Sequence, residues 1–423
     1  MSNTRVAAAA IHPAGGPMQI LYPRCAGLDV HKDIIVACVR CVSAPKHHEV
    51  RSFASTTTGL LALSDWLAGH SCTHVAMEAT GVYWKPVWHV LEDHFELVLA
   101  NAQHIRNVPG RKTDVNDATW IADLVAHGLI RSSFVPPTAT QELRDLTRTR
   151  KQLVREISQH SLRIQKILED ANLKLASVLS NVLGCSGRAI LAALVAGEDD
   201  PEHLAALAQG SARKKTSELR EALRGHVTAH HRTLLRLHLD LIAALERTRA
   251  DLDVAVGEAL APIRQHVSLL TTIPGVSELT AQVILAEIGT DMTRFIDAGH
   301  LVSWAGMCPR NDESAGKRRS TRVRKGAPWL KTALVTAAWV AVRVTHSYLH
   351  ARFLRIKARR GAKKAILAVA ASILTSAWHM LRDGVEYADL GAAYFSQRDA
   401  GQTIQRLVKR LTALGYSVQP SAA

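Results

Sequence analysis

The pattern of hydrophobic and polar positions over residues 25–130 alternates between a strand-like and a helix-like spacing. Short apolar runs predict strands at 26–31, 34–42, 49–54, 74–77 and 96–99. Apolar residues three and four positions apart predict helices at 57–68, 82–93 and 114–127. Gly128 follows the last of these helices, at the position where a left-handed residue ends a helix. Three strands in succession, followed by helix–strand alternation, predict an α/β domain with a mixed sheet and flanking helices.

After this domain the pattern becomes helical. Residues 131–140 (RSSFVPPTAT) contain two prolines and a Ser/Thr cluster, which predicts a linker. Residues 141–183 and 216–258 carry apolar residues at near-heptad spacing, interrupted at Arg150 and His160. They predict two long helices in an antiparallel, coiled-coil arm that spans 141–262. A spacer and a dimerisation element are both open interpretations of this arm.

Residues 263–385 predict a mostly α C-terminal domain. In LLTTIPGVSELTAQVILAEIG a Pro-Gly pair separates two helical patterns, as in a phosphate-binding helix–hairpin–helix or in a simple helix turn. Two apolar helices are predicted at 328–345 and 363–381. We expect residues 1–24 to form a flexible leader and residues 386–423 a helical tail.

Composition excludes several classes of protein. The 423 residues suit two or three domains, and a hydrophobic content of 47% is ordinary for a globular core. No apolar run approaches the roughly 20 residues that span a bilayer, so we expect a cytoplasmic protein with no membrane partner. Cys38 and Cys41 form a C-x-x-C inside a predicted strand, where they point to opposite faces, so we expect no zinc site.

The positive charge is concentrated in one segment. The chain carries a net charge of +15, and residues 309–364 hold sixteen Lys or Arg against two acids. A solvated helix face normally mixes both signs, so this segment predicts a surface for nucleic-acid phosphates, with an anionic membrane as a distant alternative. The candidate phosphate-binding residues are Lys317, Arg318, Arg319, Arg322, Arg324, Lys325, Arg355, Arg359 and Arg360. For the later ones, a solvated helix end is the ordinary explanation.

Four carboxylates occupy informative positions. Asp29 lies inside a predicted strand, Glu78 directly follows another, and Asp114 and Asp117 begin a helix. Each has an ordinary explanation, such as a hairpin turn, a helix cap or the helix dipole. Together they are the positions from which carboxylates converge in a ribonuclease-H-like fold. Such oxygen ligands suit Mg²⁺, and two ions would serve phosphodiester chemistry.

These segments carry a family resemblance. GLDVHKD, MEATGVYW and KTDVNDATWIADL resemble the RuvC-like N-terminal domain of the DEDD transposases of the insertion-sequence 110 family. IPGVSELTAQVILAEIG, FIDAGHLVSWAGMCPRNDESAGK and KGAPWLKTALVTAAW resemble its C-terminal transposase domain, so the resemblance runs from residue 26 to about 385. It implies that Asp29, Glu78, Asp114 and Asp117 are catalytic and bind Mg²⁺, with two ions expected and Mn²⁺ as the alternative.

The resemblance also implies a nucleophile. In related proteins a serine near a Ser-Gly motif forms a covalent phosphoserine link with DNA, and Ser314 is the matching position. This chain reads Glu-Ser-Ala-Gly there, so the match rests on Pro309, Ser314, Gly316 and Lys317, and Ala315 departs from it. From the residues alone, an ordinary polar loop serine is the simpler interpretation.

The expected function is that of a DNA transposase or recombinase that excises and inserts an insertion sequence. The resemblance implies donor and target DNA and a structured non-coding bridge RNA as partners. The absence of a recognition helix or zinc finger that would read bases suits this implication. A homodimer or tetramer with composite active sites is the expected assembly, associated with the bacterial nucleoid. The alternatives are a Holliday-junction nuclease using metal-activated water, and a nucleic-acid-binding assembly protein with a decayed site, against which the four carboxylates count.

Overall fold

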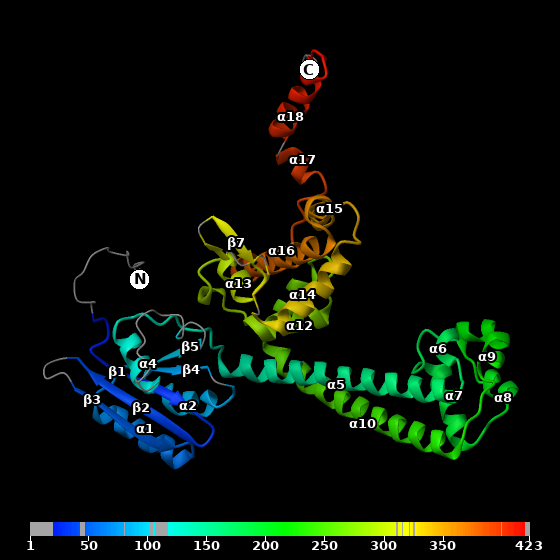
Figure 1. Cartoon of the computed structure of the whole chain (residues 1–423), viewed down its shortest axis with the longest axis horizontal. Coiled ribbons are helices and arrows are strands. Elements are labelled where there is room, and N and C mark those ends of the chain that lie inside the picture. The colour runs from blue at the N-terminus through cyan, green and yellow to red at the C-terminus, as the bar shows by residue number, and fades with distance from the viewer. Residues whose placement is uncertain are drawn as a thin grey trace. The chain divides into compact units, whose positions relative to one another are not determined.

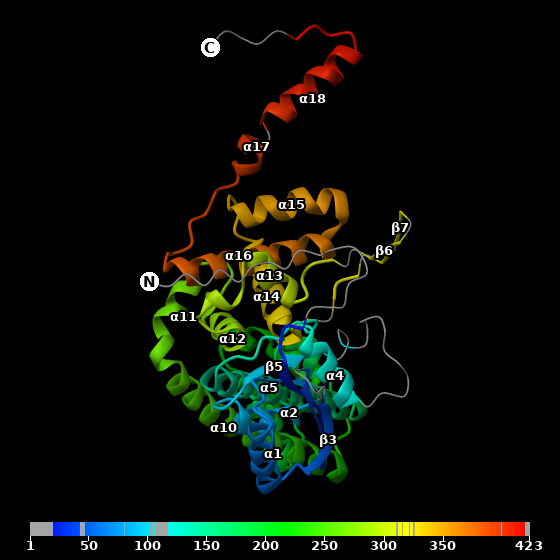
Figure 2. The same ribbon diagram turned by 90° about the vertical axis from the view of Figure 1, so that its left-hand side faces the viewer.

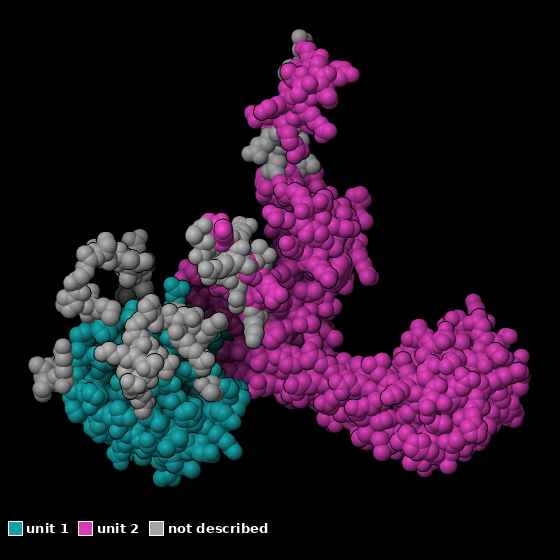
Figure 3. Space-filling view, viewed as in Figure 1, with its two compact units in different colours: residues 1–135 teal, residues 136–423 magenta. Residues whose placement is uncertain are grey.

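A computed structural model (Figure 1) describes ten stretches of the chain. They are residues 20–42, 47–79, 81–101, 105, 117–309, 312–314, 316–320, 322–324, 326–398 and 400–418. The chain forms two compact units, residues 1–135 and 136–423 (Figure 3). Their boundary lies within the segment 131–140 that was predicted to be a linker.

Unit 1 is built on a five-stranded sheet in the order β3-β2-β1-β4-β5. The strands are β1 (Arg24–Val30), β2 (Ile34–Cys41), β3 (His47–Ala54), β4 (His74–Glu78) and β5 (Glu96–Ala100). β1, β2 and β3 pair antiparallel, whereas β4 is parallel to both β1 and β5. The predicted mixed sheet is confirmed, and each strand lies within two residues of its predicted bounds.

Helices pack on both faces of this sheet. α1 (Thr57–Gly69) and α2 (Trp84–Leu91) share a hydrophobic core with alternate residues of the strands, among them Leu28 and Met77. α4 (Asp117–Ala126) packs on the other face and ends at Gly128, which has the predicted left-handed φ of +66°. The flanking helices of the predicted α/β domain are therefore present; residues 114–116 of the third predicted helix lie outside the described residues.

A pair of long antiparallel helices opens unit 2. α5 (Thr138–Asp170) and α10 (Ala229–Leu260) pack along each other (Figure 1). The two polar residues that interrupt the apolar stripe of α5 contact polar residues of α10. Arg150 forms an ion pair with Asp253, and Nδ1 of His160 lies 3.1 Å from Nδ1 of His238. These two helices make the predicted arm, whose coiled-coil geometry stays a prediction.

Both arm helices are shorter than predicted. α5 ends at Asp170, and Asn172 just beyond it has a left-handed φ of +55°. α10 begins only after Thr228, which forms a capping box with His231. Between them lie α6 (Leu175–Val178), α7 (Cys185–Ala196), α8 (Pro201–Ala206), η1 (Gly210–Lys215) and α9 (Thr216–Ala222). These elements enclose a hydrophobic core with the adjoining ends of α5 and α10, and we call them the arm tip.

The rest of unit 2 is mostly helical. Its elements are η2 (Ala261–Ile263), α11 (Arg264–Thr271), α12 (Glu278–Ile288), η3 (Met292–Arg294), α13 (Ala298–Trp304), the hairpin β6 (Asp312–Ser314) and β7 (Lys317–Ser320), α14 (Pro328–Ala341), α15 (Tyr348–Arg360), α16 (Ala362–Asp383), α17 (Tyr394–Arg398) and α18 (Ala400–Ala413). α16 is long and apolar enough to cross a membrane, but 61% of its most apolar 18-residue stretch is buried inside the protein. The helix packs against α13, α14 and α15. It is thus the central core helix of this region.

The Pro-Gly turn between α11 and α12 packs on α14. Gly275 has a φ of +83°, and a Cβ there would lie 2.4 Å from the carbonyl oxygen of Ala337. Ile273 and Val276 beside it are buried. This close approach accounts for the glycine without a bound phosphate, and it favours the simple helix turn of the two sequence interpretations.

Candidate functional site

Strand register brings two of the four carboxylates together. β1 and β4 run parallel, with Gly27 opposite Ala76 and Leu28 opposite Met77. The next residue on each strand is Asp29 and Glu78, so the two lie on neighbouring strands at their carboxyl ends. Since alternate residues of a strand share a face, both belong to the face opposite Leu28 and Met77. That is the face on which α4 packs.

The contacts of α4 define its direction along β1. The backbone N–H of Tyr22 donates to the carbonyl oxygen of Ala126 at 3.1 Å, near the end of α4. Further along β1, a Cβ on Gly27 would lie 2.3 Å from the carbonyl oxygen of Ala118 and from the nitrogen of Ala122. α4 therefore runs antiparallel to β1, and only a glycine permits so close an approach.

This direction places Asp117, the first residue of α4, toward the sheet edge that carries Asp29 and Glu78. Asp114 lies outside the described residues. Among the residues that are described, no three His, Cys, Asp or Glu side chains are close enough together to hold a metal ion. The structure thus brings the elements of three predicted carboxylates to one edge, with Asp29 and Glu78 adjacent.

The Asp29 carboxylate has a neighbour of its own. Its Oδ2 lies 3.1 Å from Nε2 of His31, which follows the end of β1. Asp29 retains 23% side-chain exposure, so it is reachable from solvent. Aspartate and glutamate oxygens are the ligands that Mg²⁺ prefers, so the chemistry of this donor set fits that ion.

Further side chains hold α4 against the sheet. Arg40 of β2 forms an ion pair with Asp123 of α4. Cys38 is buried beneath α4, and that burial raises the pKa of its thiol. Cys41 packs on the core of the opposite face, so the two thiols of the C-x-x-C lie on different sides of the sheet. The motif serves packing rather than shared metal binding.

Ser314 is the last residue of β6. It pairs with Lys317 of β7, and Gly316 between them has a φ of +72°, which suits a glycine in a hairpin turn. The two strands pack chiefly against each other, and Figure 2 shows the hairpin standing off the helices of unit 2. The side chains of Ser314, Arg318 and Arg319 lie outside the described set.

The other predicted phosphate-binding residues fall into two groups. Around the hairpin, Lys317, Arg322 and Arg324 are exposed, whereas Lys325 lies outside the described residues. On α15, by contrast, the guanidinium of Arg355 packs over the Phe395 ring at 5.0 Å from its centroid. Exposed Arg359 and Arg360 occupy the last turn of α15, where cations also suit the negative end of the helix dipole.

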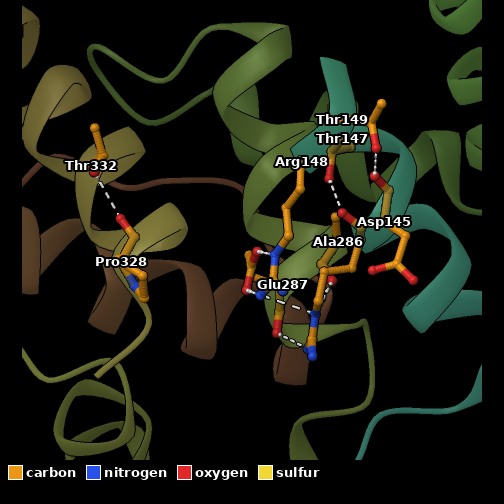
Figure 4. Close-up of polar contacts among 9 residues, drawn as sticks. Asp145, Thr147, Arg148, Thr149, Ala286, Glu287, Pro328 and Thr332 are labelled. Carbon is orange, nitrogen blue, oxygen red and sulfur yellow. Dashed lines mark hydrogen bonds and ion pairs between the residues drawn. The ribbon is translucent and has the colours of Figure 1, made fainter. Parts of the chain in front are cut away.

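A buried carboxylate that sequence analysis did not single out lies in α12. Glu287 has only 1% side-chain exposure, and Nε and Nη2 of Arg148 donate to its two carboxylate oxygens at 2.8 and 2.9 Å (Figure 4). Arg144 donates to the Glu287 carbonyl oxygen at 2.7 Å. Burial lowers the pKa of Arg144, an effect that Glu287 partly opposes. The available sequence signal was two arginines one helical turn apart.

Comparisons with known proteins identify the family. Residues 26–172 match the DEDD transposase model of IS110, and residues 267–354 match the model described as transposase IS116/IS110/IS902 family. The chain is 24% identical to the pilin gene-inverting protein of Moraxella bovis over 370 residues, which cover 84% of this chain and 95% of that protein. It is 26% identical to the insertion element IS900 uncharacterized 42 kDa protein of Mycobacterium paratuberculosis over 331 residues, which cover 69% of this chain and 80% of that protein. The first model covers the α/β domain and the first arm helix, and the second covers C-terminal helices together with the Ser314 hairpin. The chain therefore belongs to the IS110 family of transposases, which are DNA-recombining enzymes.

Proposed function

We propose that this transposase excises and inserts an insertion sequence by serine attack on DNA phosphodiesters. Ser314 is the nucleophile in this proposal, and Asp29, Glu78, Asp114 and Asp117 form the acidic part of the site. The observation that carries the proposal is the register of β1 and β4, which makes Asp29 and Glu78 neighbours on the α4 face. The sheet order β3-β2-β1-β4-β5, with one antiparallel half, supports a RuvC-like fold for this domain.

The acidic residues would hold Mg²⁺, or Mn²⁺ in its place, through carboxylate oxygens. When bound, such ions polarise the phosphate and stabilise the oxygens that attack and leave. His31 contacts Oδ2 of the Asp29 carboxylate at 3.1 Å, which orients the one oxygen that remains. α4 carries Asp117 to the same edge because Gly27 lets the helix approach β1.

The proposed reaction is an exchange of one phosphodiester for another. The Ser314 hydroxyl loses its proton as its Oγ forms a bond to phosphorus, and the P–O bond to one side of the cut strand breaks. The leaving oxygen takes up a proton and becomes a hydroxyl. A hydroxyl of a second strand then attacks the phosphoserine, which restores the serine and rejoins the DNA without loss of bond energy.

The proposed assembly follows from where these residues lie. The carboxylates belong to unit 1 and Ser314 to unit 2, so one site needs parts of both. We propose a homodimer or tetramer in which one protomer supplies the carboxylates and another the serine. Cations around the hairpin would position DNA without reading its sequence, and base pairing with a bridge RNA would supply the specificity. The Moraxella bovis relative is named for gene inversion, which is a DNA rearrangement of the same general kind.

The test is an adduct assay with RNA transcribed from the regions that flank the gene. The protein is incubated with labelled donor and target DNA in Mg²⁺, as wild type, Ser314→Ala and Asp29→Ala. Ser320→Ala in β7 and Asp33→Ala in the exposed turn after β1 are the matched controls. We expect a protein–DNA adduct that survives denaturation in the wild type and both controls, and that disappears in the other two variants.

The same assay separates the alternative enzyme. The carboxylate pair would equally serve a RuvC-like junction nuclease that activates water. Cleavage without an adduct, retained in Ser314→Ala and lost in Asp29→Ala, would establish that activity and refute the serine mechanism.

A further inference from the structure

Four cations form a stripe along one face of α5. Arg144, Arg148, Lys151 and Arg155 are spaced at intervals of four, three and four residues. Residues at this spacing on an α-helix lie one above another on the same side. The segment that was predicted to bind phosphates begins only at residue 309, so this stripe is a separate concentration of positive charge.

The two halves of the stripe have different partners. Arg144 and Arg148 contact Glu287, which satisfies them within the protein. Lys151 and Arg155 have no acidic partner among the residues that the structure describes. The guanidinium of Arg155 instead lies over the ring of Trp329 at 4.9 Å from its centroid, and Arg148 approaches the same ring at 5.9 Å.

The half of the stripe formed by Lys151 and Arg155 is electrostatically unfavourable, because two positive charges lie close together there without an acidic partner in the described part of the chain. Burial and the charge of Arg155 both lower the pKa of Lys151, so the protein does not compensate that charge. Trp329 lies in the first turn of α14, where the helix dipole is also positive. An anion that contacts Lys151 and Arg155 would relieve this repulsion.

The stripe is connected to the serine hairpin. Nζ of Lys331, two residues after Trp329, donates to the carbonyl oxygen of Arg324 at 2.8 Å. The neighbouring residue, Val323, pairs with Pro309 at the base of the hairpin that carries Ser314. The first turns of α14, which carry Trp329, are therefore hydrogen-bonded to the segment that closes the Ser314 hairpin.

We infer that Lys151 and Arg155, with Trp329 holding the Arg155 guanidinium, bind the phosphate backbone of the DNA that is led to Ser314. We call these three residues the phosphate ledge. The planar guanidinium fork matches phosphate oxygens, and the Trp329 ring fixes its plane. The choice of DNA as the ligand rests on the proposed function, because it follows from the proximity to the serine hairpin.

The test measures binding of a 20-base-pair DNA duplex of arbitrary sequence to the full-length protein as NaCl is raised. Each lost phosphate contact lowers the slope of log affinity against log salt by about 1, so Lys151→Gln/Arg155→Gln should lower it by about 2. Arg163→Gln/Lys166→Gln is the matched control, because it removes one exposed Arg and one exposed Lys from the same helix. Its slope should equal that of the wild type. Lys151→Arg/Arg155→Lys keeps the charge and should also keep the slope.

Two results would refute the proposed role of the phosphate ledge. One is an unchanged slope for the duplex in Lys151→Gln/Arg155→Gln, including the case in which only the slope for a single-stranded RNA decreases. The other is an equal decrease in the matched control. The adduct assay is read independently. A wild type that forms no adduct refutes the serine mechanism while the salt slopes still decide the ledge, and an adduct with unchanged slopes refutes only the ledge.

Discussion

The Glu287 carboxylate of α12 accepts two hydrogen bonds from the Arg148 guanidinium of α5, a residue 139 positions earlier in the chain. This bidentate pair (Figure 4) joins the arm to the C-terminal helices of unit 2. The hydrogen bond from Arg144 to the Glu287 carbonyl oxygen joins the same two elements. A carboxylate with 1% exposure is stable there only because both of its oxygens are paired.

Glu287→Gln should loosen this junction. The amide can accept from only one of its former donors, and Arg144 and Arg148 would then repel each other without a compensating charge. We expect a loss of about 2–3 kcal/mol in the stability of the junction. Hydrogen exchange of α12 peptides measures it directly. Glu246→Gln is the control, because Glu246 also pairs with an arginine, Arg188, but is far more exposed, and its effect should stay below about 1 kcal/mol. Equal protection in both variants would contradict the argument.

Gly27→Ala should displace α4 from β1. The added Cβ would lie 2.3 Å from backbone atoms of Ala118 and Ala122, which cannot rotate away as a side chain could. We expect a destabilisation of about 1–3 kcal/mol and loss of metal-dependent DNA cleavage, since Asp117 moves with α4. Thermal unfolding and cleavage assays measure the two effects.

Gly69→Ala, at the end of α1, is the control for that substitution. A Cβ at Gly69 meets nothing within 4 Å, so this change should be neutral or slightly stabilising. Full cleavage activity in Gly27→Ala would mean that the position of α4 does not matter to the site.

The stability of the arm should fall with acid. Burial, followed by the charges of His160 and Arg163, lowers the pKa of His238 below its usual value. As pH falls through about 6.5 the unfolded chain therefore binds a proton that the folded arm does not, and the free energy of unfolding decreases until the folded pKa is passed. Hydrogen exchange of α10 peptides between pH 7.5 and 5.5 tests this decline, with exchange rates corrected for intrinsic pH dependence. His238→Gln should flatten it, and an identical pH profile would show that another group is responsible.

Thiol reactivity should follow burial. Burial raises the pKa of Cys25 and of Cys72 to about 12, so neither is a thiolate near neutral pH. Cys185 is exposed at the start of α7. We expect iodoacetamide at pH 8 to modify Cys185 first and to leave Cys25 and Cys72 intact until urea unfolds unit 1. Mass spectrometry of timed samples gives the order, and native Cys25 reacting as fast as Cys185 would disprove it.

The sequence predicted the sheet well because its strands are short apolar runs bounded by turn residues. It overextended the arm helices because the leucine stripe continues past their ends: Leu175 and Leu219 belong to the core of the arm tip instead. It gave no bounds for α15 and offered only a solvated helix end there, because that helix buries little more than Leu349 and Phe353 among many cations.

The site was predictable to different degrees. Asp29 and Glu78 could be placed together because strand ends in a parallel pair meet at one edge. Glu287 could not be recognised, since both arginines that contact it lie about 140 residues away in the chain. The family resemblance added Ser314, which no local pattern distinguishes from an ordinary loop serine.

The hydrogen bond between Asp170 and His231, at 3.0 Å, shows that the chain leaves α5 and enters α10 at neighbouring points. Topologically, the sixty residues between them are an insertion into a helical hairpin. Because its ends already meet, such a module can be lengthened or exchanged without changing where the chain leaves α5 and enters α10, provided that its replacement still covers Ile164, Leu168 and Leu235 of the two helices. A variable cassette at this place would let members of the family change what the far end of the arm contacts while keeping one catalytic core.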